Sequence, residues 1–303
     1  MGEHQDIEAP APIGVVGAGT MGAGVAQCFA QAGRRVVVVD PHEEARRDGA
    51  ARLRSGMRLR RLLGGGADAA LADAVAPVEF SAEPGDLAQA SFVVECARER
   101  EPLKEEILRE LDRVCGPDTI LASCTSAIPI ARLASFTGRP DRVIGTHFMN
   151  PAPVKDAVEV ACSARTSEET LRRTRDLLAA IGKKPVVVGD GPGFVTNRVL
   201  MLTINEAAAV LDQGTADAET VDRVFRECFG HPMGPLRTGD LIGLDTVVDT
   251  LDVLRTHTGD ARFRPYPLLA GLVAEGRVGR KAGRGFHSYP QSPLVARGET
   301  SHG

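Results

Sequence analysis

His147 and Glu159 are the two residues whose types and spacing most plainly predict chemistry in this chain. His147 follows the apolar run at residues 143–146, and Glu159 lies inside a second apolar run at 157–160. On neighbouring strands, an imidazole and a carboxylate can serve as a general base and the group that orients it. A carboxylate in an apolar strand is costly without a partner. The sequence therefore predicts a proton-transfer site on two adjacent strands.

A glycine-rich segment near the start predicts a dinucleotide-binding turn. It reads Gly17-Ala18-Gly19-Thr20-Met21-Gly22, a G-x-G-x-x-G motif between an expected strand at 13–16 and an expected helix at 21–32. The glycines allow a tight turn, close approach of a pyrophosphate and close helix–strand packing, and the helix N-terminus favours the anion. The alternative is a glycine-rich turn that binds nothing.

Asp40 ends the second expected strand, where a carboxylate can accept hydrogen bonds from the adenosine ribose. It would repel a 2′-phosphate, and no arginine follows it directly in the sequence. The cofactor expected is therefore NAD rather than NADP.

Composition limits the other possibilities. The 303 residues are long enough for two domains, and the net charge of −4 gives no reason to expect a nucleic acid or an anionic membrane as partner. None of the six cysteines has zinc-site spacing, so no metal is expected. Scattered cysteines, together with the lack of a signal peptide or an apolar span, predict a cytoplasmic enzyme.

The pattern of elements changes near residue 190. Before it, apolar runs alternate with helical patterns, which predicts a parallel sheet with strands at 13–16, 35–40, 92–95, 119–122, 142–146, 157–161 and 184–188. Helices are expected between them at 21–32, 43–63, 103–114 and 168–181. After the Gly189–Gly193 turn, helices are expected at 194–212, 217–229, 241–257 and 266–275. We predict an α/β Rossmann-type domain over 1–189 and an all-helical domain over 190–303, with a disordered tail at 291–303.

Several further motifs, in order, make the chain similar to a known family. They are Thr125-Ser126, His147-Phe148-Met149-Asn150-Pro151, Val158-Glu159-Val160, Gly191-Pro192-Gly193-Phe194-Val195-Thr196-Asn197-Arg198, Pro232-Met233-Gly234-Pro235, Gly243-Leu244-Asp245-Thr246 and Lys281-Ala282-Gly283-Arg284-Gly285-Phe286. With the glycine motif, they resemble the L-3-hydroxyacyl-CoA dehydrogenase family, which includes 3-hydroxybutyryl-CoA dehydrogenases. The resemblance runs from about Pro12 to Tyr289.

The resemblance implies a role for each matching residue. His147 matches the general base and Glu159 its carboxylate partner, while Ser126 and Asn197 match residues that contact the 3-oxygen of the substrate. Further matches are to cofactor-binding positions, at Ser126, Asn150, Glu99, Lys104 and Lys281. The family also implies a homodimer through the helical domain. Taken alone, the residues also allow simpler interpretations. In these, Asn197 caps a helix, and Glu99, Lys104 and Lys281 are solvated charges.

The chain departs from the family pattern in three places. Cys124 stands where most relatives have asparagine, Lys155-Asp156 introduces charges after the histidine motif, and the helix at 43–63 carries arginines where relatives have serine and lysine. These arginines (Arg52, Arg54, Arg58, Arg60 and Arg61) suit the phosphates of coenzyme A, the surface of an acyl carrier protein, or only a solvated face.

The sequence allows three main functions and one further enzyme alternative. The first is NAD-dependent oxidation of a 3-hydroxyacyl-CoA thioester, or the reverse reduction. The second is the same chemistry on a hydroxyacyl group held by an acyl carrier protein, as in extender-unit biosynthesis, and a sugar-acid dehydrogenase of the same fold is a further enzyme alternative. The third is a non-catalytic NAD-binding sensor or crystallin-like protein, against which the set of His147, Glu159, Ser126 and Asn197 argues.

Overall fold

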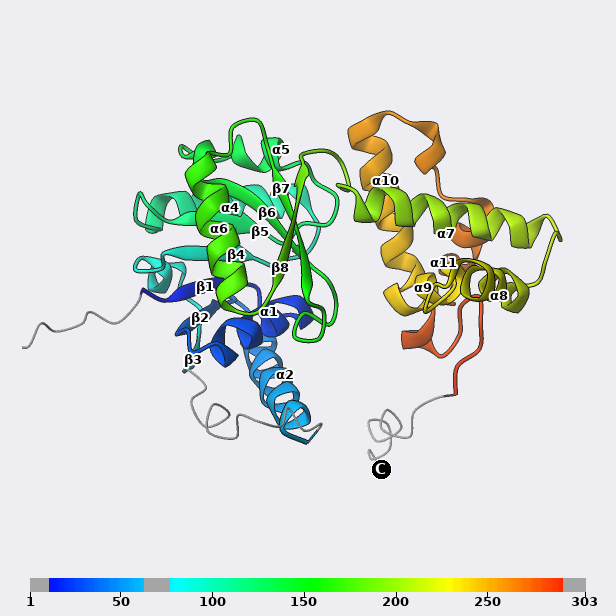
Figure 1. The fold of residues 1–303 in the computed structure, drawn as a ribbon, viewed down its shortest axis with the longest axis horizontal. Coiled ribbons are helices and arrows are strands. Elements are labelled where there is room, and N and C mark those ends of the chain that lie inside the picture. Colours follow the sequence, from blue (N-terminus) through cyan, green and yellow to red (C-terminus); the bar gives the residue numbers. More distant parts are fainter. Residues whose placement is uncertain (1–10, 63–76, 291–303) are drawn as a thin grey trace, which may run out of the picture. The chain divides into compact units, whose positions relative to one another are not determined.

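The computed structural model describes residues 11–62 and 77–290, with side chains to residue 58 in the first range. The side chains of Arg60 and Arg61, the expected helix end at Leu63 and the tail at 291–303 lie outside the described residues. Within the described part, no helix is both long and apolar enough to cross a membrane. The chain divides into two compact units, the first ending at Phe194 and the second beginning at Val195 (Figure 1).

The first unit is built on one eight-stranded sheet. Its strand order is β3-β2-β1-β4-β5-β6-β7-β8. The strands are β1 (Ile13–Val16), β2 (Val36–Val39), β3 (Val78–Ser81), β4 (Phe92–Glu95), β5 (Ile120–Ser123), β6 (Val143–Phe148), β7 (Ala157–Cys162) and β8 (Lys184–Gly189). From β1 the sheet grows through β2 to β3, and the chain then crosses back to place β4 on the other side of β1. Ligands of such sheets bind at this switch point, between β1 and β4.

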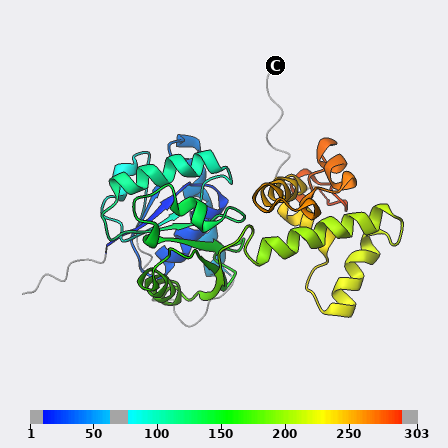
Figure 2. The same cartoon turned by 90° about the horizontal axis from the view of Figure 1, so that it is seen from above.

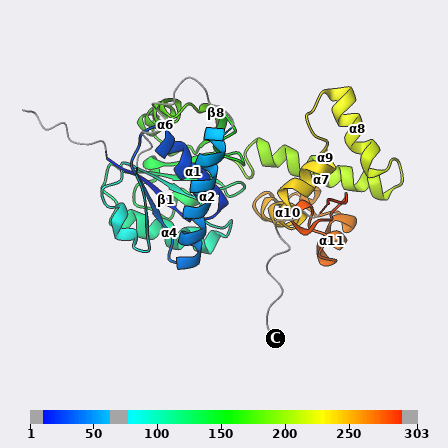
Figure 3. The ribbon, with the colours of Figure 1, turned by 90° about the horizontal axis from the view of Figure 1, so that it is seen from below.

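Helices cover both faces of the sheet (Figures 2 and 3). They are α1 (Thr20–Gln31), α2 (Glu43–Leu62), α4 (Glu101–Val114), α5 (Ile130–Ala134) and α6 (Glu168–Ala180). Val25 and Phe29 of α1 share a buried core with Leu178 of α6 and with the strands beneath them. The expected helices and strands of this unit are present, but β3 and α5 were not predicted. Both are short and lack a clear periodic pattern.

One expectation about the sheet is wrong. The sequence predicted a parallel sheet, whereas β7 runs antiparallel to β6 and then pairs in parallel with β8. The connection between β6 and β7, residues 149–156, is too short for the crossover that a parallel pair needs. His147 also lies within β6 rather than beyond its end. The reversal makes His147 and Glu159 register partners.

The second unit consists of helices. They are α7 (Thr196–Asp212), α8 (Ala218–Phe229), α9 (Pro235–Ile242), α10 (Leu244–Thr258) and α11 (Pro267–Ala274). The helix expected at 241–257 is in fact α10, and α9 was missed. Gly243 separates the two with a φ of 103°, a conformation that glycine adopts without strain.

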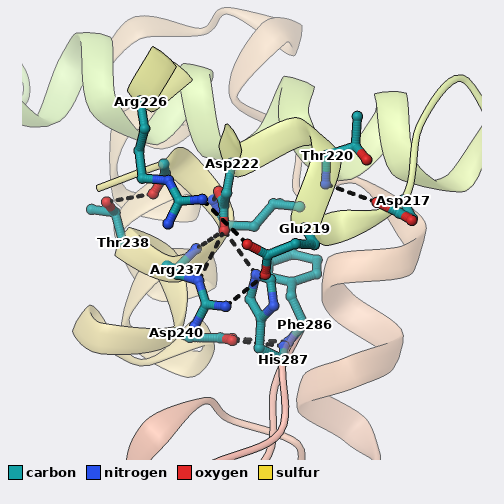
Figure 4. Close-up of polar contacts among 12 residues, drawn as sticks. Asp217, Glu219, Thr220, Asp222, Arg226, Arg237, Thr238, Asp240, Phe286 and His287 are labelled. Atoms are coloured by element: carbon teal, nitrogen blue, oxygen red, sulfur yellow. Dashed lines mark hydrogen bonds and ion pairs between the residues drawn. The ribbon is translucent and has the colours of Figure 1, made fainter. Parts of the chain in front are cut away.

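Two buried carboxylates hold the last described segment against α8 and α9 (Figure 4). Asp222 accepts hydrogen bonds from the amides of Leu236 and Arg237 and lies 2.8 Å from Nε2 of His287. Asp240 accepts the amides of Phe286 and His287, both at 2.9 Å. Because both carboxylates are fully buried, these bonds fix the path of the chain after α11.

Candidate active site

His147 and Glu159 face each other across the β6–β7 junction. Nδ1 of His147 lies 3.1 Å from Oε2 of Glu159, and both residues are buried, at 9% and 5% exposure. The ring of Phe194, which sequence reasoning did not single out, lies 6.3 Å from the imidazole, centroid to centroid. Two register-paired strands and an aromatic side chain therefore fix the imidazole with its Nδ1 edge toward a carboxylate.

The glycine motif forms the turn between β1 and α1. Gly17 has a φ of 98°, and a Cβ on Gly22 would lie 1.8 Å from the Gly17 carbonyl oxygen, so both positions require glycine for the fold itself. Gly19 differs, because a Cβ built there has no atom within 4 Å. The N-terminus of α1 also lacks a side-chain cap. This open, uncapped helix end fits a pyrophosphate group.

Asp40 lies beside this turn. Its carboxylate accepts the Ala18 amide at 2.9 Å and the His42 amide at 3.0 Å. Arg46, from the first turns of α2, reaches back and donates to the Asp40 carbonyl at 2.7 Å. Sequence reasoning found no arginine near Asp40, because the helix brings Arg46 back over six positions. A carboxylate and a guanidinium cation therefore lie together where the adenosine ribose is expected.

Glu95 and Lys104 form a buried ion pair below the switch point. Nζ of Lys104 lies 2.7 Å and 2.8 Å from the two carboxylate oxygens of Glu95, and neither side chain is exposed beyond 1%. The same carboxylate accepts the Ser123 hydroxyl at 2.6 Å and the Ala97 amide at 2.7 Å. Burial alone would lower the pKa of Lys104, but the charges of Glu95 and then Glu99 outweigh it and raise that pKa. The Glu95 carboxylate therefore joins the carboxyl end of β4 to Ser123 of β5 and to α4.

Glu99 holds the turn that carries Ser126. One of its carboxylate oxygens accepts the amides of Ser126 at 3.0 Å and Ala127 at 2.9 Å, and also the Thr125 hydroxyl. Its other oxygen lies 3.5 Å from the Lys104 ammonium. That Glu99 and Lys104 bind the cofactor stays a prediction; in the structure Glu99 holds the Ser126 turn, and Lys104 contacts Glu99.

Asn150 lies in the loop after β6, next to the cis peptide bond that precedes Pro151. Lys183, another residue that sequence reasoning missed, donates from Nζ to the carbonyls of Ala152 and Lys155, each at 2.8 Å. A buried lysine with two carbonyl partners anchors this loop below the active-site strand. Its signal in the sequence was only that lysine is rare in the chain.

Asn197 and Lys281 belong to the second unit. Asn197 is the second residue of α7, and the Lys281 ammonium lies 2.6 Å from a carboxylate oxygen of Asp245, just after the start of α10. Both residues therefore lie in the helical unit.

Cys124 extends β5 by one residue beyond Ser123, where its backbone amide donates to the Glu95 carbonyl at 2.7 Å. The neighbouring Cys96 thiol lowers the pKa of Cys124, and nearby His147 and the Phe148 amide lower it further against the effect of burial. The interaction with Cys124, together with burial, raises the pKa of Cys96. The position where the family pattern has asparagine thus holds an acidified thiol.

Comparisons with known proteins match both units of the chain to one family. Residues 12–191 match the family model "3-hydroxyacyl-CoA dehydrogenase, NAD binding domain", and residues 193–289 match "3-hydroxyacyl-CoA dehydrogenase, C-terminal domain". The expected Rossmann-type sheet, the helical unit and NAD as cofactor are thereby confirmed.

Individual relatives cover almost the whole chain. A probable 3-hydroxybutyryl-CoA dehydrogenase of Bacillus subtilis is 42% identical over 92% of this chain and 97% of its own length. The mitochondrial hydroxyacyl-coenzyme A dehydrogenase of Sus scrofa is 35% identical over 91% and 90%. The crystal structure of (S)-3-hydroxybutyryl-CoA dehydrogenase from Ralstonia eutropha superposes with a TM-score of 0.86 at 40% identity, covering 93% of this chain and 99% of that one. The chain belongs to the 3-hydroxyacyl-CoA dehydrogenase family of NAD-dependent oxidoreductases.

Proposed function

We propose that this enzyme interconverts short-chain 3-hydroxyacyl-CoA and 3-oxoacyl-CoA thioesters, with His147 as the general acid and base. The observation that carries the proposal is the 3.1 Å contact between His147 Nδ1 and Glu159 Oε2 at the carboxyl end of β6. Several relatives of similar length are named 3-hydroxybutyryl-CoA dehydrogenases, which supports a short acyl chain. The direction of the reaction follows the supply of oxidised or reduced cofactor.

The proton transfer follows from the geometry of the imidazole. Glu159 engages Nδ1, so Nε2 is the nitrogen that exchanges a proton with the substrate hydroxyl. As the imidazole takes that proton it becomes a cation, and the adjacent carboxylate stabilises it in a buried setting. When bound, NAD supplies the hydride acceptor, which is chemistry that no side chain here can provide.

Other residues position the reacting groups in this proposal. Ser126, on the turn that Glu99 fixes, hydrogen-bonds the 3-oxygen of the substrate, and Asn197 from α7 is its second partner. Asn150, on the loop that Lys183 anchors, lines the nicotinamide end. Asp40 binds the adenosine ribose. The pyrophosphate is bound by the turn of Gly17, Ala18, Gly19, Thr20, Met21 and Gly22. Lys281 is a further cofactor-binding residue in this proposal.

Coenzyme A is the proposed carrier of the acyl group. Arg52, Arg54 and Arg58 on α2 are exposed, as cations that meet phosphates must be. An acyl carrier protein is the second candidate, favoured by the same exposed arginines.

We also propose a homodimer through the helical unit, supported by the exposed apolar side chains of Val199, at 60% exposure, and Phe229, at 67%. A cytoplasmic location is proposed as well, supported by six free cysteines.

One experiment tests the substrate proposal. The purified enzyme is assayed for NADH oxidation with acetoacetyl-CoA, longer 3-oxoacyl-CoA esters and acetoacetyl groups on an acyl carrier protein. We expect the highest kcat/KM with acetoacetyl-CoA. A preference of tenfold or more for the carrier protein would replace coenzyme A by the second candidate. Turnover with neither would contradict the proposed function.

A further inference from the structure

Cys96 and Cys124 are paired by the sheet itself. Glu95 of β4 and Ser123 of β5 are register partners in a parallel ladder, and each cysteine is the next residue along its strand. The β1–β4 ladder and the β4–β5 ladder both continue for that one residue. The Cys96 amide donates to the Val16 carbonyl, and the Cys124 amide donates to the Glu95 carbonyl. Neighbouring strands lie about 4.8 Å apart, which is within the range of about 4.4–6.8 Å between the Cα atoms of a disulfide.

The two thiols also interact. Each shifts the pKa of the other, downward for Cys124 and upward for Cys96. Cys96 and Cys124 are only partly buried residues, whereas Cys28 and Cys115 are buried. A small oxidant can therefore reach two cysteines that are register neighbours, directly beside the strand that carries His147.

We infer that Cys96 and Cys124 are a redox-modification site, at which a hydroperoxide reversibly converts the two thiols into a disulfide. The assignment rests on the register pairing and the incomplete burial of the two residues. Its effect on turnover rests, in addition, on the function proposed above.

The two steps balance with hydroperoxide as the oxidant. The Cys124 thiolate attacks the peroxide, the O–O bond breaks, and a sulfenic acid and one molecule of alcohol or water form. The Cys96 thiol then attacks the Cys124 sulfur, an S–S bond forms and the S–O bond breaks, and a second water leaves with the proton of Cys96. The lowered pKa of Cys124 makes it the sulfur that reacts first, since the thiolate is the nucleophile.

The disulfide would change the site in two ways. It would remove the thiol that lies beside His147, and it would join the ends of β4 and β5 at the point where Gly17 turns toward the cofactor. A Cβ on Gly17 would lie only 3.0 Å from the Cys96 carbonyl oxygen, so this turn has little room to adjust. We therefore expect the oxidised enzyme to lose most of its turnover and to regain it after treatment with dithiothreitol.

Peptide mapping after treatment with hydrogen peroxide tests the bond directly and needs no activity. No lysine or arginine lies between Arg113 and Arg132, so Cys115 and Cys124 share a tryptic peptide. The mapping therefore uses the C115S variant. The expected product joins the peptide ending at Arg98 to the peptide ending at Arg132, with the loss of two hydrogens. If that product is absent, or Cys96 and Cys124 appear only in separate oxidised forms, the proposal is overturned.

Two variants sharpen the test. C96S lacks the resolving thiol, so prolonged peroxide should oxidise Cys124 to a sulfinic acid that dithiothreitol does not reverse, measured against the variant's own reduced rate. C228S removes an exposed cysteine elsewhere and should behave like the parent enzyme. Full recovery of C96S would overturn the proposal. A disulfide that forms without any loss of turnover would leave the redox pair intact and count instead against the active site proposed above.

Discussion

Glu159 Oε2 lies 3.1 Å from His147 Nδ1 across the antiparallel junction of β6 and β7. The reversal of strand direction at residues 149–156 creates this pair, since register partners of an antiparallel ladder point to the same face of the sheet. Both residues are almost fully buried, so the contact is held in a setting where a lone carboxylate would be costly. The pair is thus a feature of the fold and also the centre of the proposed chemistry.

Replacing either partner should lower turnover without unfolding the chain. H147Q removes the proton acceptor and should reduce kcat by about 10²-fold or more, the scale of general base catalysis. E159Q keeps the shape and a hydrogen bond but loses the charge that stabilises the imidazolium, and should lower kcat by about tenfold or more. Steady-state kinetics measures both effects. Fluorescence titration with NADH is the control and should be unchanged, whereas a kcat for H147Q within tenfold of the parent would remove His147 from the mechanism.

Gly19 and Gly22 offer a matched pair of substitutions. G19A meets no atom within 4 Å, so it should fold normally, yet its methyl group would occupy the proposed pyrophosphate position. We expect an increase in KM for NADH of about tenfold or more, equal to about 1.4 kcal/mol of lost binding. G22A would place its Cβ 1.8 Å from the Gly17 carbonyl oxygen and should unfold at a clearly lower temperature. If G19A bound NADH normally, the pyrophosphate would have to lie elsewhere.

Asp40 and Arg46 together predict a change in cofactor preference. D40A removes the carboxylate that repels a 2′-phosphate, while Arg46, which lies against the Asp40 carbonyl, remains to attract it. The ratio of kcat/KM for NADPH to that for NADH should rise by about 10–100-fold, in keeping with hydrogen bonds to charged groups. The double variant D40A/R46A should lose much of the gain in NADPH use. An unchanged ratio in D40A would show that Asp40 does not bind the ribose.

The sequence predicted the site residues that depend on local pattern. Gly17 to Gly22, Asp40 and the strand of His147 each follow from spacing within a single segment of the chain, and the strands and helix expected around them form. The antiparallel direction of β7 was not predicted from its strand pattern, which is the same in either direction; the short connection at 149–156 is what excludes a parallel pair. Arg46, Lys183 and Phe194 were missed for a different reason. Each contacts a segment that lies beside it only in the folded chain, and hydrophobic periodicity carries no information about such contacts.

Lys104 and Glu95 make a prediction about stability. K104M leaves the Glu95 carboxylate buried without a cation, and should lower the free energy of unfolding by about 3–5 kcal/mol in urea titration. The double variant E95Q/K104M removes both charges and should recover part of that loss. If the single and double variants were equally destabilised, the charge of Glu95 would not be the cause.

The same pair predicts a dependence on pH. The folded chain raises the pKa of Lys104 above its ordinary value of 10.5. A raised lysine pKa stabilises the fold fully below the unfolded pKa, and that contribution is lost as the pH rises through the higher folded pKa. The difference in unfolding free energy between the parent and E95Q/K104M should therefore be constant from neutral pH to about pH 9 and shrink above about pH 10.4. A difference that instead shrank between pH 7 and 9 would contradict a protonated, ion-paired Lys104.

Gly285 and Gly271 test the carboxylate network of the helical unit. A Cβ on Gly285 would lie 1.9 Å from Oδ1 of Asp240, the carboxylate that accepts the amides of Phe286 and His287. G285A should therefore cost about 2–4 kcal/mol of stability, through overpacking and through displaced hydrogen bonds. Hydrogen–deuterium exchange should place the loss in α9 and in residues 286–289. G271A, in α11, is the control, because its Cβ meets no atom within 4 Å and alanine favours a helix by up to about 1 kcal/mol. Equal stability of the two variants would mean that Asp240 does not hold this segment.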